Sequence, residues 1–363
     1  MTAPARKSSP PAPIAAQPTL PGVGAALRCR RLAASAALLG LAAFAHPPAS
    51  VRVERTVFLM GTAATLVAEA PDRTTGLAQL ERMVLVIEAT EAELSTWRDD
   101  SVLSRLNRQP LGAARPVPPS VCGLLGRLAA WRQATGGAFD PAVGRLVEAW
   151  GLREGGRRPT TAALAAARAR TGLRHLTVDA EACTAARRAD VTLDAGGFGK
   201  GEAIDRVRDA LRDRAGAWLI DFGGQVAVAG ARSDGAWPVA IAHPERRGAP
   251  AAELQLSAGS LATSGGSERD LTSSGGERIG HILDPRTGEP VGRRGSVVVW
   301  HRDAFAADVL STALHVMGPE PGLAWAAARG IAACFLQAAA ASDEVVFRPT
   351  PAFATRFALP RRR

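Results

Sequence analysis

The second half of the chain constrains the fold most strongly. Residues 217–300 consist mostly of short apolar runs separated by glycine-containing turns, among them WLIDFGGQVAVAG, WPVAIAH, AELQLSA and GSVVVWH. Such runs predict short strands joined by tight turns. Helical patterns flank this region and do not alternate with its strands. We therefore expect an α+β fold of mostly antiparallel sheets with packed helices, rather than a parallel α/β fold.

The spacing of apolar residues predicts the other elements. Strands are expected over residues 51–69, broken at Met60-Gly61-Thr62, and near 331–347. A short strand is also expected just after Asp190, and Ser120 is a candidate N-cap. Apolar residues at helical spacing predict helices over 77–94, 120–135, 141–150, 160–170, 201–214 and 304–328. No composition break divides the region after the leader, so we predict a leader (1–45), a linker (46–52), one domain (53–357) and a basic tail (358–363).

The first 45 residues resemble an export signal. Arg28, Arg30 and Arg31 precede the apolar run LAASAALLGLAAFA, which ends in a small-x-small pattern before His46. This run is shorter than the roughly 20 residues needed to span a membrane, which favours a cleaved signal over an anchor. The Arg30-Arg31 pair is compatible with a twin-arginine signal, and no cysteine follows the run, which argues against a lipoprotein. We expect an exported protein, periplasmic or membrane-associated.

The net charge of +10 would suggest nucleic-acid binding if it were spread over one surface. It is concentrated at the ends of the chain instead. The leader holds five basic residues and no acidic one, and Arg361-Arg362-Arg363 adds three more, so the rest of the chain carries only +2. We therefore expect no nucleic-acid partner.

The cysteines show no metal-binding spacing. They are widely separated, at positions 29, 122, 183 and 334. Cys122 and Cys334 lie in apolar sequence and are expected in the core. One disulfide is possible, but the sequence does not assign its pairing.

A glycine-rich segment carries the first chemical signal. Asp194-Ala195-Gly196-Gly197-Phe198-Gly199-Lys200-Gly201 lies between an expected strand and an expected helix. Glycines allow close approach of a ligand to the backbone, and a helix N-terminus favours an anion such as phosphate. Lys200 is the only lysine after the leader in a chain that otherwise uses arginine. The alternative is an ordinary turn with a solvated lysine.

A second signal lies in the helix AFAADVLSTALHVMG. Asp308 is the only acidic residue in this apolar stretch, and Thr312 lies four residues further on, on the same face. A buried carboxylate needs a partner or a cation. Carboxylate and hydroxyl oxygens suit Mg²⁺, although a capped or ion-paired aspartate would explain the pattern equally well.

Three further clusters combine polar residues with turns. His281 stands beside the turn Asp284-Pro285-Arg286-Thr287-Gly288 and is a candidate general base. Asp140 precedes Pro141, where it could cap a helix or bind a ligand. Trp97 lies in a polar stretch, where it could stack on a flat ring or border the core.

The motifs, taken in order, resemble the ApbE family of FAD:protein FMN transferases, formerly described as thiamine biosynthesis lipoproteins. The resemblance covers about residues 53–340. It rests on Met60-Gly61-Thr62; Ser95-x-Trp97 with Ser101-x-x-Ser104-x-x-Asn107; Gly137-Ala138-Phe139-Asp140-Pro141; Asp194-Ala195-Gly196-Gly197-x-x-Lys200-Gly201; Asp221-Phe222-Gly223-Gly224; Ala262-Thr263-Ser264-Gly265; His281-x-x-Asp284-Pro285-Arg286-Thr287-Gly288; and Ala307-Asp308-x-x-Ser311-Thr312-Ala313.

This resemblance implies a fold related to the T-fold, FAD as substrate and Mg²⁺ as cofactor. The implied reaction splits the pyrophosphate of FAD, joins FMN to a Ser or Thr hydroxyl of an acceptor protein and releases AMP. The implied catalytic residues are His281, Lys200 and Asp284, with His281 as base. The implied Mg²⁺ ligands are Asp308, Thr312 and the carbonyl group of Gly197. The implied FAD contacts are Met60, Trp97, Ala138, Phe139, Asp140, Asp194, Lys200 and Ile282.

Two other functions remain open at this point. One is an FAD pyrophosphatase, in which water replaces the acceptor and gives FMN and AMP. The other is a non-catalytic FAD-binding protein, against which His281, Asp308 and Thr312 argue. For the transferase, we expect the acceptor to be a membrane or exported electron-transfer protein.

Overall fold

A computed structural model describes residues 50–360, apart from 215, 233, 247, 267–269, 274, 275, 277, 293 and 340–343. The expected leader and the last three residues of the basic tail lie outside the described residues. Residues His46–Arg363 form one compact unit. Within the described residues, no helix combines the length and apolar character needed to cross a membrane.

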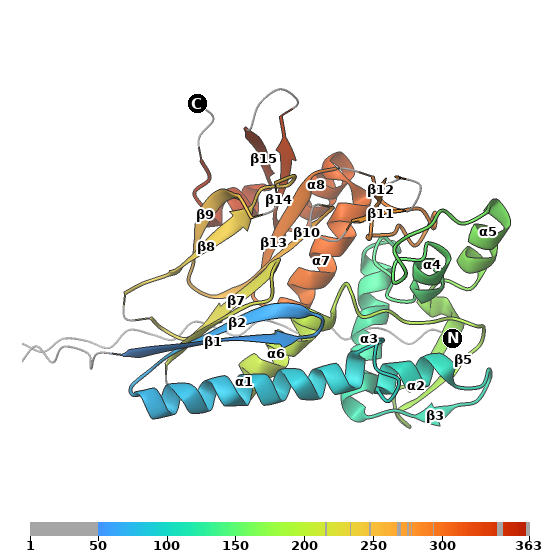
Figure 1. The fold of residues 1–363 in the computed structure, drawn as a ribbon, viewed down its shortest axis with the longest axis horizontal. Helices are drawn as coiled ribbons and strands as arrows, with labels where there is room; N and C mark the ends of the chain where they lie inside the picture. Colours follow the sequence, from blue (N-terminus) through green and yellow to red (C-terminus); the bar gives the residue numbers. More distant parts are fainter. Residues whose placement is uncertain are drawn as a thin grey trace, which may run out of the picture. The chain divides into compact units, whose positions relative to one another are not determined.

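One antiparallel sheet of eight strands organises this unit (Figure 1). Its order is β1-β2-β6-β7-β10-β13-β14-β15, and each neighbouring pair is antiparallel. The strands are β1 (Val51–Leu59), β2 (Thr62–Ala70), β6 (Ala217–Asp221), β7 (Gln225–Ala229), β10 (Gly259–Gly265), β13 (Ser296–His301), β14 (Ala332–Ala338) and β15 (Val345–Pro349). The α+β prediction is confirmed, and so is the break at Met60-Gly61, where both residues have positive φ.

The two faces of the sheet are covered by different elements because side chains alternate along each strand. In β13, Val297 and Val299 pack with α7 (Ala304–Met317) and α8 (Pro319–Ala327), as expected for 304–328. Val298 points to the opposite face, which is covered by the hairpin β8 (Trp237–Ala242) and β9 (Pro250–Leu256). Helices α1 (Arg73–Leu94) and α6 (Gly199–Ala210) extend the helical layer beneath β1, β2 and β7. The short α9 (Pro351–Arg356) ends the fold beside β14.

A smaller group of elements gathers at one end of the sheet (Figure 1). It contains two elements that were not predicted from the sequence: a 3-10 turn (Leu173–His175) and a three-stranded sheet. The sheet consists of β3 (Arg115–Pro116), β5 (Thr184–Arg187) and β4 (Leu176–Asp179). Its helices are α2 (Val102–Arg108), α3 (Pro119–Ala134), α4 (Gly144–Ala149) and α5 (Thr161–Ala169). Two short strands, β11 (Leu271–Thr272) and β12 (Arg278–Ile279), form a separate pair.

Helix α7 joins the two parts of the core. Leu310 and Leu314 pack against the sheet, whereas Phe305, Val309 and Ala313 pack into the core around α3. A helix that is apolar on nearly every side must be buried on nearly every side. This position between the two parts brings polar residues of α7 to the pocket described below.

Three local predictions were wrong. Helix α3 has Pro118 as its N-cap without a side-chain cap, and the Ser120 hydroxyl bonds to the carboxylate of Glu93 instead. Asp140 does not cap α4, which begins only at Gly144. The segment just after Asp190 is irregular, because its Leu193 backbone pairs with the amide of Asn107 and not with a strand.

Candidate active site

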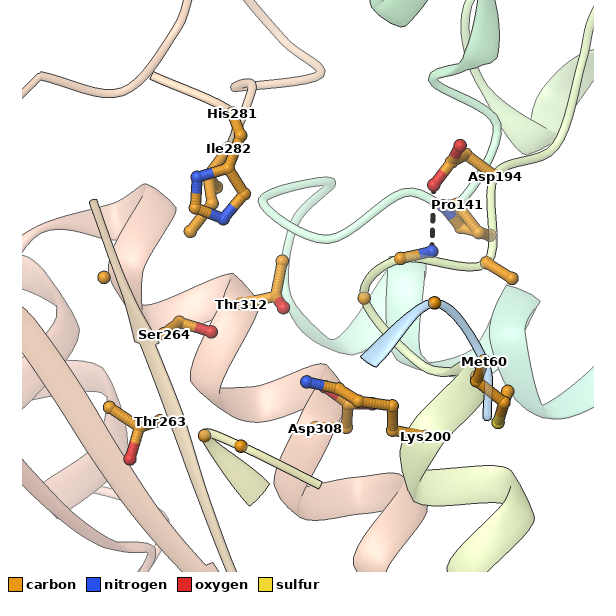
Figure 2. A pocket seen from close by; sticks show the side chains of 18 of the residues that line it. Met60, Pro141, Asp194, Lys200, Thr263, Ser264, His281, Ile282, Asp308 and Thr312 are labelled. Carbon is orange, nitrogen blue, oxygen red and sulfur yellow. Dashed lines mark hydrogen bonds between the residues drawn. The ribbon is translucent and has the colours of Figure 1, made fainter. Parts of the chain in front are cut away.

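A pocket of about 760 Å³ lies between α7, the start of α6 and the loops around them. This volume is within the range of sites that hold a cofactor-sized ligand. The pocket gathers twelve of the thirteen site residues expected from the sequence, and only Asp284 does not line it. The twelve are Met60, Trp97, Ala138, Phe139, Asp140, Asp194, Gly197, Lys200, His281, Ile282, Asp308 and Thr312. Figure 2 shows His281, Thr312, Asp308 and Lys200 around the pocket, with Asp194 and Met60 on its right-hand side.

The glycine-rich turn is held in shape by Asp194. Its carboxylate accepts a hydrogen bond from the N–H of Gly196 at 2.8 Å, drawn as a dashed line in Figure 2. The other carboxylate oxygen pairs with Arg153 at 2.7 Å. Helix α6 then begins at Gly199, two residues earlier than expected, so Lys200 lies in its first turn. The helix dipole and a lysine charge thus meet at the pocket, an arrangement suited to phosphate.

The start of α6 touches α7 through Gly201. Its N–H donates to a carboxylate oxygen of Asp308 at 3.1 Å. A Cβ at this position would lie 2.4 Å from the carbonyl oxygen of Ala304, which is too close for any side chain. Gly201 therefore permits the contact that positions Asp308 at the pocket.

Asp308 and Thr312 lie one turn apart on α7, and both line the pocket. Asp308 is 5% exposed. A Cβ added to Gly197 would lie 3.3 Å from the Thr312 hydroxyl oxygen, so the glycine turn passes directly beside this threonine. A carboxylate, a hydroxyl and a nearby peptide backbone make an oxygen-rich corner.

The imidazole of His281 is held by a residue that the sequence analysis missed. Its Nδ1 lies 3.1 Å from a carboxylate oxygen of Asp270, which also accepts the backbone N–H of His281 at 3.3 Å. Burial acts to raise the pKa of the Asp270 carboxyl, but the hydrogen bonds from His281 outweigh it, and Arg278 adds to them, so the pKa lies below its usual value. Asp270 is therefore ionised at neutral pH. It lies 11 residues before His281 in the sequence, and no local pattern links the two residues.

Asp284 has a different environment from the one expected for a catalytic residue. Its carboxylate bonds to the Arg286 guanidinium at 2.8 Å and accepts the backbone N–H of Arg286 at 2.9 Å. Burial acts to raise its pKa, and these Arg286 bonds more than reverse that effect. Asp284 thus fixes the turn after His281, and the carboxylate beside the imidazole belongs to Asp270.

The aromatic wall of the pocket is also organised by a missed residue. Trp97 is 75% exposed, and the Arg153 guanidinium lies 4.5 Å from its ring centre. Arg153 also bonds to the carbonyl of Thr96 and to Asp194, so it connects the tryptophan loop to the glycine turn. Because the sequence is rich in arginine, nothing in it distinguished Arg153 as the residue that makes this connection.

Asp140 lies at the pocket wall, but its carboxylate is occupied by the protein. It accepts the N–H groups of Ala142 and Leu173 and pairs with Arg132 at 2.6 Å. Its contribution is to hold the loop that presents Ala138 and Phe139 to the pocket.

Fold and pocket together define a single-domain α+β protein whose large pocket joins a glycine-rich turn to a histidine that is held by a carboxylate. Residues 60–335 match the model of the ApbE family, and the chain belongs to that family.

Similar proteins cover most of the chain. The FAD:protein FMN transferase of Klebsiella pneumoniae is 33% identical over 64% of this chain and 69% of its own length. That of Vibrio cholerae is 31% identical over 68% of this chain and 75% of its own. The crystal structure of the flavinyl transferase ApbE of Pseudomonas stutzeri in its apo form superposes with a TM-score of 0.74 at 30% identity, covering 85% of this chain and 97% of that one. The crystal structure of the ApbE protein of Thermotoga maritima superposes with a TM-score of 0.77 at 27% identity, covering 84% of this chain and 99% of that one.

Proposed function

We propose that this protein is an FAD:protein FMN transferase, which joins the FMN part of FAD to a Ser or Thr hydroxyl of an acceptor protein and releases AMP. The single observation that carries the proposal is the shared pocket of Lys200 and His281 in a member of the ApbE family. The relatives named above bear that activity in their names.

The pocket offers FAD two kinds of contact. Trp97, Met60 and Phe139 provide flat or apolar surfaces for its rings. The positive end of the α6 dipole and the Lys200 ammonium would attract the pyrophosphate. Because phosphoryl transfer depends mainly on positioning and charge neutralisation, Lys200 would stabilise the negative charge that grows on the departing AMP.

His281 is suited to remove the proton of the acceptor hydroxyl. Asp270, as an ionised acceptor, favours the tautomer with hydrogen on Nδ1, which leaves the Nε2 lone pair available as a base. The hydroxyl oxygen would then bond to the phosphorus of the FMN moiety, the bond from this phosphorus to the bridging oxygen would break, and AMP would depart with that oxygen.

The oxygen-rich corner fits Mg²⁺ by its chemistry. Asp308 supplies a buried carboxylate and Thr312 a hydroxyl close to the Gly197 backbone, whose carbonyl would be the third ligand, and such hard oxygen ligands are the type that Mg²⁺ prefers. The described residues contain no cluster of three or more His, Cys, Asp or Glu side chains that could hold a metal, so this mixed set is the candidate. A bound Mg²⁺ would supply charge neutralisation at the phosphates.

The test incubates the purified protein with FAD, Mg²⁺ and a candidate acceptor, an exported or membrane electron-transfer protein with an accessible Ser or Thr. We expect in-gel flavin fluorescence on the acceptor and one AMP released per FMN transferred. Free FMN at the same rate with and without acceptor would establish the pyrophosphatase instead. Bound FAD without any AMP would establish a non-catalytic binding protein.

The metal assignment has a matched test on α7. Thr312→Val and Asp308→Asn should abolish Mg²⁺-dependent turnover. Ser311→Ala should retain it, because Ser311 does not line the pocket, and its hydroxyl bonds to Ser264 and to the backbone carbonyl of Asp308 rather than to the Asp308 carboxylate. Equal activity of all three variants would overturn the assignment.

We also propose that the protein is exported and acts in the periplasm or at the membrane. The basic and apolar leader supports this proposal. N-terminal sequencing of protein recovered from a cell fraction outside the cytoplasm should begin near His46, whereas a full-length cytoplasmic product would contradict it.

A further inference from the structure

Two cysteines that are far apart in the sequence meet beside α3. Cys122 lies near the start of α3, and Cys183 immediately precedes β5. Their sulfur atoms lie 4.0 and 3.8 Å from the same carbonyl oxygen, that of Ala180. Cys183 also packs against the core cluster that contains Cys122. The fold thus brings together two thiols that the sequence left unassigned.

The backbone around Cys183 holds this arrangement in place. Its φ of 46° is in the left-handed region, which residues with a side chain rarely adopt. The carbonyl of Cys183 accepts the N–H of Val117 at 2.9 Å, which ties the β4–β5 hairpin to the segment just before α3. Two N–H groups of the hairpin turn, those of Glu181 and Ala182, bond to the Asp179 carboxylate. The hairpin therefore presents Cys183 to α3 in a fixed orientation.

The two thiols differ in solvent exposure, which sets the order in which an oxidant reaches them. Cys122 is buried, whereas Cys183 is partly accessible. Hydrogen bonding to the Cys183 thiol and burial raise the pKa of Cys122. An oxidant would thus reach Cys183 first, with Cys122 positioned behind it.

The third described cysteine is no competitor. Cys334 belongs to β14 and to the core cluster on the β8–β9 side of the sheet, away from the cluster around α3. Burial raises its pKa to about 12, which keeps it as a thiol. It serves as an internal control for reactivity.

We propose that Cys122 and Cys183 form a disulfide bond when the protein meets a small-molecule disulfide such as oxidised glutathione. The Cys183 thiolate attacks one sulfur of the oxidant and releases one reduced thiol. The Cys122 thiolate then attacks the resulting mixed disulfide, forms the protein S–S bond and releases a second reduced thiol. The protein loses two hydrogens and two electrons, and the oxidant gains them. The bond would fasten the β4–β5 hairpin to α3.

The test exposes the purified full chain to oxidised glutathione, alkylates the remaining thiols and maps tryptic peptides by mass spectrometry. We expect one cross-link, between the peptides of Cys122 and Cys183, and full alkylation of Cys334. Because the closed loop has about 60 residues, the oxidised protein should melt about 5 °C above the reduced one. The Cys334→Ala variant should keep both effects, and Cys183→Ser should lose both.

Two results would overturn the proposal. One is full alkylation of Cys122 and Cys183 after oxidation of a protein that remains folded by circular dichroism. The other is a cross-link of Cys122 to Cys29 or Cys334 in place of Cys183. Because Cys183 is partly exposed at a turn, Cys183→Ser should fold, and Cys183→Ala gives a second variant with the same expected loss.

Discussion

The contact between Asp270 and His281 gives the sharpest test of the site. In Asp270→Asn the side chain keeps its size, so the buried position stays filled. The charge that faces Nδ1 of His281 at 3.1 Å is lost. The Asp270 side chain is only 7% exposed and that of His281 26%, so solvent screens the pair weakly. The variant therefore removes mainly the electrostatic support of the imidazole.

The size of the effect follows from the type of hydrogen bond. A bond to a charged group contributes about 1.5–3 kcal/mol and a neutral one about 0.5–1.5 kcal/mol. The difference of about 1–2 kcal/mol applies to the state in which His281 carries the proton of the acceptor. At about 1.4 kcal/mol per factor of ten, the transfer rate should fall roughly 5- to 30-fold.

The assay is transfer of FMN to an acceptor at saturating FAD, with binding of FAD measured separately. We expect a lower kcat with an unchanged KM for FAD, because Asp270 acts through His281. Asp284→Asn is the matched control, since its carboxylate bonds to Arg286 and not to the imidazole. Full activity of Asp270→Asn, or an equal loss of kcat in both variants, would refute the reasoning.

Two further predictions concern stability. Gly201→Ala should destabilise the protein by about 1–3 kcal/mol, because its Cβ would lie 2.4 Å from the carbonyl oxygen of Ala304. Gly126→Ala in α3 is the control: it has open space around it and should stabilise the protein by about 0.5–1 kcal/mol. Equal denaturant midpoints of the two variants would contradict the close contact at Gly201. Burial, with smaller contributions from neighbouring charges, lowers the pKa of His315 from 6.5 to about 4, so the unfolded chain binds its proton first and stability falls as the pH drops from 6.5 towards 4. Between pH 7 and 5 this lowers the free energy of unfolding by about 2 kcal/mol. His315→Gln should reduce the fall by that amount, and urea titrations at the two pH values measure it. An equal fall in the variant and in the unsubstituted protein would disprove the prediction.

Local sequence patterns predicted the elements that depend on local chemistry. The break at Met60-Gly61 and the paired helices over 304–328 needed only turn residues and helical spacing. Where tertiary contacts compete, prediction failed. Leu193 bonds to Asn107, 86 positions away, and so does not extend a strand, and Ser120 bonds to Glu93 instead of capping α3.

The sequence by itself determined which residue types could serve the site, since a single lysine after the leader, a lone acid in an apolar helix and a histidine beside an Asp-Pro turn are all visible in the chain. Only the tertiary structure decided how they combine. It placed the Asp270 carboxylate beside His281, and it brought Cys122 to Cys183. The physical reason is that hydrogen bonds and thiol contacts act over a few ångströms in space, and distance along the chain does not report distance in the folded protein.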